Sequence, residues 1–193
     1  MSLGAALLLT LQSAPAVPVA PALERPMLDA FRTVCDKVDS LDGMKAAALA
    51  SGWEEIPDNA EPRIERLTKF GRESVGEDGT ASGANFRRLL DGRTLFLIVS
   101  RYDDKSGFWG NGCRLYHFEA AAGIPDAELE SWMGRKATGI VSPGAQHGRR
   151  LLWEPGWRDG LTIEINHLPQ TSIYREQYGL SGNILVAQAI GGF

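Results

Sequence analysis

Residues 86–101 read FRRLLDGRTLFLIVSR, two apolar stretches separated by the dipeptide Asp91-Gly92. An Asp-Gly pair supplies the two positive-φ residues that a tight hairpin turn requires. We therefore expect residues 86–90 and 93–101 to pair as antiparallel strands. Because both faces of residues 95–99 are apolar, this strand is expected at the centre of a sheet that is covered on both sides.

Further strands are predicted after this hairpin. Residues 112–119 return as a strand after a glycine-rich turn, residues 149–154 and 161–167 form a second hairpin, and residues 183–190 form an apolar strand. Consecutive strands that are joined by turns indicate an antiparallel sheet.

Three helices are predicted around these strands. Apolar residues recur every three or four positions between 28 and 38, which indicates an amphipathic helix opened by Pro26. Residues 42–51 and 125–136 form the other two, and Gly139 is expected to end the last one. The prediction is an α+β fold, ordered two helices, three strands, one helix and three strands. In it, one antiparallel sheet of about five to six strands has helices packed on a face, in a single domain (residues 23–193).

The pattern between residues 57 and 83 is weaker. Ile64, Leu67 and Phe70 are spaced by three residues, which predicts either one short helix or an edge strand. Glycines then recur through residues 76–83, and we expect this segment to be a flexible loop.

The first 22 residues carry no charge. Residues 3–11 form an apolar run that is too short to span a bilayer, and small residues with prolines follow it. Residues 14–16 and 20–22 have the small-x-small pattern of signal-peptidase sites. We predict a cleaved signal peptide or a disordered leader at residues 1–22, a periplasmic or secreted protein, and no membrane span after leader removal.

The chain contains two cysteines, Cys35 and Cys113. A lone pair of cysteines usually forms a disulfide in an oxidising compartment, whereas two distant cysteines in the cytosol are usually buried thiols. Since the leader predicts export, we expect these two to be bridged.

Composition and spacing argue against several classes of function. A net charge of −4 and a pI near 5.4 disfavour nucleic acid as a partner. His117, His147 and His167 are too far apart in sequence for a local metal clamp, so no metal and no cofactor are predicted. A nucleophile elbow of the G-x-S-x-G type is absent from the sequence.

Large aromatic residues fall in two expected turns. Such residues either anchor a turn on the core or offer a contact surface to a partner. The candidate contact residues are the turn aromatics and their polar neighbours: Trp109, Phe108, Trp157, Arg158, Asp103 and Asp104.

These observations predict an exported, non-enzymatic binding or inhibitor-type domain, with an envelope protein, peptide or carbohydrate as its partner. The alternative is a cell-envelope hydrolase with dispersed Asp, Glu and His residues. A hydrolase should have a concave pocket with at least two convergent ionisable groups, whereas a binding domain should have a shallow aromatic patch.

Overall fold

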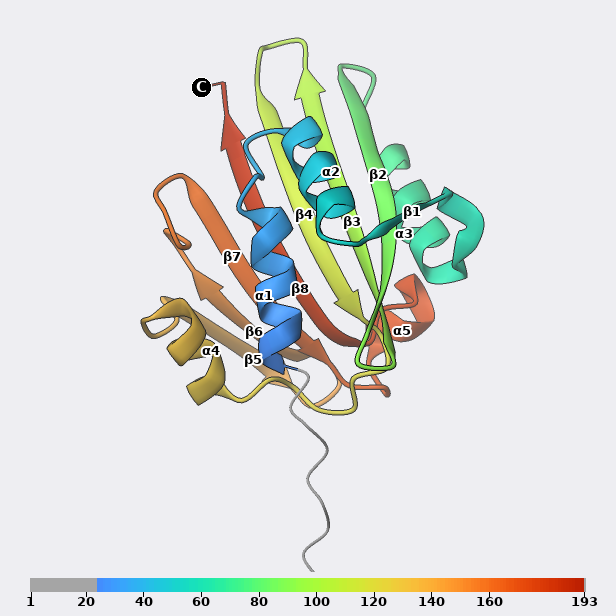
Figure 1. The fold of residues 1–193 in the computed structure, drawn as a ribbon. Helices are drawn as coiled ribbons and strands as arrows, with labels where there is room; N and C mark the ends of the chain where they lie inside the picture. The colour runs from blue at the N-terminus through green and yellow to red at the C-terminus, as the bar shows by residue number, and fades with distance from the viewer. Residues whose placement is uncertain (1–23, 193) are drawn as a thin grey trace, which may run out of the picture.

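One antiparallel sheet of eight strands, in the order β1-β2-β3-β4-β8-β7-β6-β5, forms the centre of the protein (Figure 1). The computed structural model describes residues 24–192, so the expected leader lies outside the described residues. The expectation of five to six strands is wrong, because the sheet has a further short strand at each edge, β1 and β5, that the sequence did not predict. The strands are β1 (Glu54–Ile56), β2 (Gly79–Leu90), β3 (Arg93–Asp104), β4 (Trp109–His117), β5 (Gly139–Gly144), β6 (Gly148–Trp153), β7 (Leu161–Leu168) and β8 (Gly182–Gly191).

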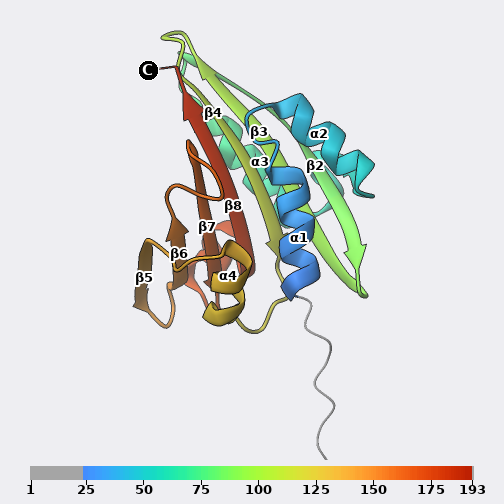
Figure 2. The same ribbon diagram turned by 60° about the vertical axis from the view of Figure 1, so that its left-hand side comes forward.

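Helices cover both faces of the sheet rather than one. On the first face lie α1 (Glu24–Cys35), α2 (Leu41–Ala50) and α4 (Asp126–Met133), while α3 (Pro62–Glu73) and α5 (Ile173–Tyr178) lie on the second face (Figures 1 and 2). A short 3-10 helix, Asp58–Ala60, precedes α3. In residues 24–192, no helix is both long and apolar enough to cross a membrane.

The central hairpin forms as its sequence predicts. Asp91 and Gly92 have φ values of 49° and 77°, which a two-residue turn with positive φ requires. Leu97 and Val99 point into the core beneath α1 and α2, whereas Phe96 belongs to the core on the opposite face. The third strand in the sheet, β3, is therefore buried from both sides.

Two boundaries differ from the sequence prediction, both at glycines. Residues 79–83 belong to β2 and pair with the far end of β3, so the expected loop at residues 76–83 is wrong. A side chain at Gly83 would collide with the Val99 carbonyl, so glycine permits this close pairing rather than breaking the strand. The helix α4 ends at Gly134 (φ 72°), and Gly139 opens β5 instead of ending the helix.

A disulfide joins Cys35 and Cys113, as predicted. Cys35 ends α1 and Cys113 lies in β4, and their Cα atoms are 5.5 Å apart. Both cysteines are fully buried, next to apolar side chains of α1, β3 and β8. The bond therefore fixes the end of the first helix to the middle of the sheet.

We expect the double variant Cys35→Ala, Cys113→Ala to lose about 4–5 kcal/mol of unfolding free energy. The bond closes a loop of 78 residues, and its loss frees the unfolded chain. Urea unfolding of both proteins, with and without a thiol reductant, measures the difference. The reductant should destabilise only the wild type, and a loss below about 1 kcal/mol would contradict the prediction.

Candidate functional site

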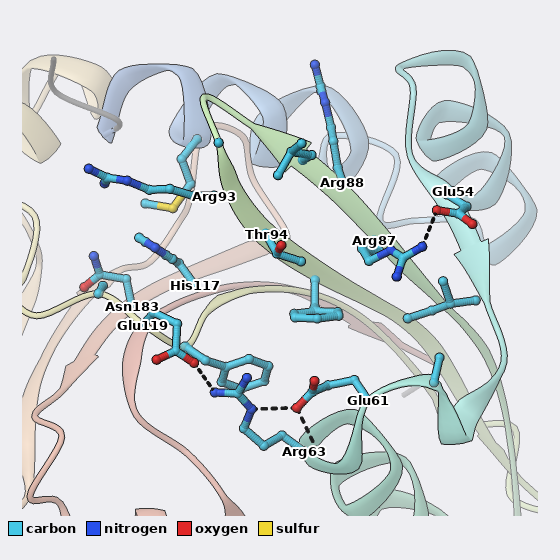
Figure 3. A pocket seen from close by; sticks show the side chains of 18 of the residues that line it. Glu54, Glu61, Arg63, Arg87, Arg88, Arg93, Thr94, His117, Glu119 and Asn183 are labelled. Carbon is cyan, nitrogen blue, oxygen red and sulfur yellow. Dashed lines mark hydrogen bonds and ion pairs between the residues drawn. The ribbon is translucent and has the colours of Figure 1, made fainter.

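An open cleft of about 1200 Å³ lies where the β2–β3 turn, the end of β4 and the start of α3 meet (Figure 3). We call it the arginine cleft. Its walls carry four arginines and four glutamates, so their formal charges cancel. These are Arg63, Arg87, Arg88, Arg93, Glu24, Glu54, Glu61 and Glu119.

Arg63 holds one wall of this cleft together. Its Nε lies 2.7 Å from Glu61 Oε1 and its Nη1 lies 2.6 Å from Glu119 Oε1, and the guanidinium stacks over the Phe118 ring at 4.3 Å. Partial burial acts to lower the pKa of Arg63, but the hydrogen bonds that Arg63 donates to Glu61 and Glu119, with their negative charges, outweigh it and raise this pKa. Arg63 is therefore a fixed structural cation that ties α3 to the end of β4.

The remaining arginines differ in their partners. Arg87 Nη2 lies 2.8 Å from Glu54 Oε2, an ion pair between β2 and β1. Arg93 follows the hairpin turn and extends toward His117 and Asn183 on the opposite wall from Arg87 (Figure 3). Among residues 24–192, neither Arg93 nor Arg88 has an ion-pair partner, so these two cations are available to a ligand. Figure 3 shows Arg88 directed away from His117 and Asn183, so Arg93 is the better placed of the two to bind a ligand inside the cleft.

A polar row crosses three strands beside Arg93. His117 on β4 pairs with Asn183 on β8, which in turn pairs with His167 on β7, so the three lie on one face. The Asn183 side-chain oxygen accepts a hydrogen bond from His167 Nδ1 at 3.0 Å, and its amide nitrogen donates to the Ala122 carbonyl at 3.3 Å. Asn183 therefore links the segment after β4 to the sheet.

The environment of His117 favours its neutral form. Only 6% of its surface is exposed, and burial lowers its pKa. The positive charge of Arg93 lowers that pKa further, while Glu119 and Glu24 oppose the change. At neutral pH, His117 therefore presents an uncharged imidazole beside the Arg93 guanidinium.

The sequence-predicted residues at the first turn form one group. The Asp104 carboxylate accepts hydrogen bonds from the backbone N–H groups of Ser106 and Phe108, and so shapes the turn between β3 and β4. Asp103 binds Arg101, whose guanidinium lies 5.4 Å from the centre of the Trp109 ring. The structure thus brings Trp109, Asp103 and Asp104 together.

Trp157 and Arg158 form a second group, in the connection between β6 and β7. The Trp157 ring lies 5.9 Å from Phe31 of α1 and 5.7 Å from Trp132 of α4. Arg158 binds Asp39 at 2.6 Å. In the described chain, no hydrogen bond, ion pair or ring contact joins Trp157 to Trp109, although both turns lie at the same end of the sheet. Partner contact by either group stays a prediction.

Local sequence patterns do not distinguish the residues of the arginine cleft from a mixed, solvated surface. Arg63 and Arg93 belong to two arginine groups with interleaved acids, at 63–72 and 87–93. The available signal was that Arg87, Arg88 and Arg93 flank the Asp91-Gly92 turn, which places them together at one sheet end. The spacing of His117 argues against a local metal clamp and does not indicate this cleft. In residues 24–192, no three His, Cys, Asp or Glu side chains form a group that could hold a metal ion.

No protein-family model matches this chain, and neither a curated protein nor a solved structure matches it significantly. The function must therefore be argued from the geometry of the site.

We expect acid to destabilise the wild type more than the variant His117→Gln. The folded-state pKa of His117 is lowered, so near and below the unfolded value of about 6.5 the unfolded chain binds more protons. The stability that the neutral imidazole contributes is present at pH 7.5 and is lost as the pH falls toward 5. Urea unfolding across this range measures it, and parallel losses in both proteins would contradict the prediction.

We expect Trp157→Ala to lose about 3 kcal/mol of unfolding free energy, because its ring fills the space between α1 and α4. Trp157→Phe, which keeps an aromatic ring there, should lose less than half as much in the same urea titration. If both variants unfold like the wild type, the indole does not anchor this loop and is free to contact a partner.

Proposed function

We propose that this protein is an exported, non-enzymatic domain whose arginine cleft binds an acidic segment of an envelope protein or peptide. The observation that carries the proposal is Arg93. It extends along one wall of the cleft without a carboxylate partner in the described chain, beside a neutral His117 (Figure 3). An unpaired guanidinium at the wall of a cleft binds carboxylates through charge-assisted, bidentate hydrogen bonds.

The other charges of the cleft support binding at a defined position. Arg63 and Arg87 are already neutralised by Glu61, Glu119 and Glu54 at 2.6–2.8 Å. Together these two arginines and three glutamates carry one excess negative charge, which disfavours an acidic group placed beside them, and Arg93 remains as the attractive position. Such an arrangement gives specificity as well as affinity.

The concave shape and the convergent ionisable groups also fit the hydrolase alternative. Binding is favoured because Glu54, Glu61 and Glu119 are each held by an arginine. Moreover, Thr94 is the one hydroxyl side chain in the lining among residues 24–192, and no hydrogen bond joins it to His117 as a nucleophile to its base. Export is supported by the buried disulfide, since such bonds persist in oxidising compartments.

We expect Arg93→Glu to weaken partner binding at least tenfold, since it replaces attraction for an acidic group by repulsion. The tagged protein, recovered from the extracytoplasmic fraction of its own cells, is used to capture partners from envelope extract. The dissociation constant of the main partner is then measured with purified proteins at two salt concentrations.

Lys136→Glu is the matched control, because it makes the same change in charge at an exposed position outside the cleft. It should bind like the wild type. Equal affinity of the two variants, or recovery of the tagged protein only from the cytosol, would contradict the proposal.

A further inference from the structure

A second groove, of about 600 Å³, lies on the sheet face that carries α3. We call it the Arg114 groove. Its floor is the second face of β2, β3, β4 and β8, and α3 forms one wall. It shares no lining residue with the arginine cleft, so it is an independent feature.

A glycine, Gly112, forms the part of the groove floor on which the Arg114 side chain lies. Arg114 and Gly112 are two residues apart on β4 and therefore face the same side. The guanidinium lies directly over Gly112, at a position where any β-carbon on that residue would collide with Nη1. Glycine at position 112 thus lets the Arg114 side chain lie flat along the sheet, inside the groove.

Arg114 is half-buried and makes one hydrogen bond, from Nη1 to Ser100 Oγ at 3.1 Å. The acidic residue in the lining, Asp58, is engaged elsewhere, by Arg72 at 2.7 Å and by the Asn85 amide at 2.7 Å. No ion pair neutralises Arg114 within the described chain. A partly desolvated cation without a counterion favours an anionic ligand, because the ligand's charge offsets the cost of that burial.

The rest of the groove's surface is mostly apolar, although the amides of Asn111 and Gln188 and two paired arginines, Arg72 and Arg101, also line it. Phe70 on α3 and Ile190 on β8 are 51% and 56% exposed, so both offer apolar surface to a ligand in the groove. Ile98 and Tyr102 of β3 lie between these two walls. The groove therefore combines one cation that has no ion pair in the described chain with extended apolar surface. Its volume lies within the range of small-molecule sites, roughly 300–1000 Å³.

We propose that the Arg114 groove binds a single-chain fatty acid, a carboxylate with an apolar tail. The carboxylate binds the Arg114 guanidinium next to Ser100, and the chain lies against Ile98, Phe70 and Ile190. Fatty-acid binding at the Arg114 groove is independent of partner binding at the arginine cleft.

The test is calorimetric titration of the purified protein with decanoate, decan-1-ol and acetate. Decanoate should bind, and the alcohol, which has the same tail, and acetate, which has the same head, should each bind at least tenfold more weakly. Absence of decanoate binding, or equal affinity for decan-1-ol, overturns the proposal.

Two variants test the arginine, each with a matched control. Arg114→Met should weaken decanoate binding about tenfold or more, whereas Arg150→Met, on the same face outside the groove, should not. Gly112→Ala should displace the guanidinium and weaken binding similarly. Gly139→Ala, on β5 outside the groove, should not, because its added methyl group would make only ordinary 3.6 Å contacts with Leu152.

Urea unfolding is measured on all four variants. If Arg114→Met is unfolded, binding by Gly112→Ala tests the proposal instead. This variant should fold, because its added methyl group meets only the end of the flexible Arg114 side chain, which can move aside. Wild-type affinity in a folded Arg114→Met or in Gly112→Ala overturns the proposal, as does an equal loss in Arg150→Met.

Discussion

The bond between Cys35 and Cys113 holds the end of α1 against β4, and the first face of the sheet is organised around it. Phe31 and Val34 of the same helix are fully buried on this face. The helices α2 and α4 both contact α1 rather than forming separate layers. The position of α1 therefore determines where its neighbours lie, and Trp157 closes the gap between α1 and α4 from the far hairpin.

The sequence was most informative where local chemistry decides the structure. The turn at Asp91-Gly92 requires positive φ, and residues 95–99 are all apolar, so that successive side chains are buried on opposite faces of the sheet. The hairpin could therefore be predicted from its own residues. The edge strands β1 and β5 could not be predicted from their own residues. Three residues in β1, and glycines with Pro143 in β5, form strands only because β2 and β6 supply hydrogen-bond partners.

The arginine cleft was not predictable, because its walls come from segments far apart in the chain. Arg63 on α3, Arg93 on β3 and His117 on β4 meet only after the sheet order is known. Each looks like an ordinary polar residue in its own segment. The same limit applies to Gly112, whose lack of a side chain matters only through the path of Arg114.

The last strand of the described chain, β8, lies inside the sheet, between β4 and β7. Before Gly182–Gly191 is in place, β1–β4 and β5–β7 are two separate ribbons, and each has an open edge. Pairing of β8 with β4 joins residues some 70 positions apart, as His117 and Asn183 show, and such non-local pairing is slow. Any conformation in which β8 is not docked therefore leaves the edges of β4 and β7 unpaired, and unpaired strand edges are sites at which chains aggregate.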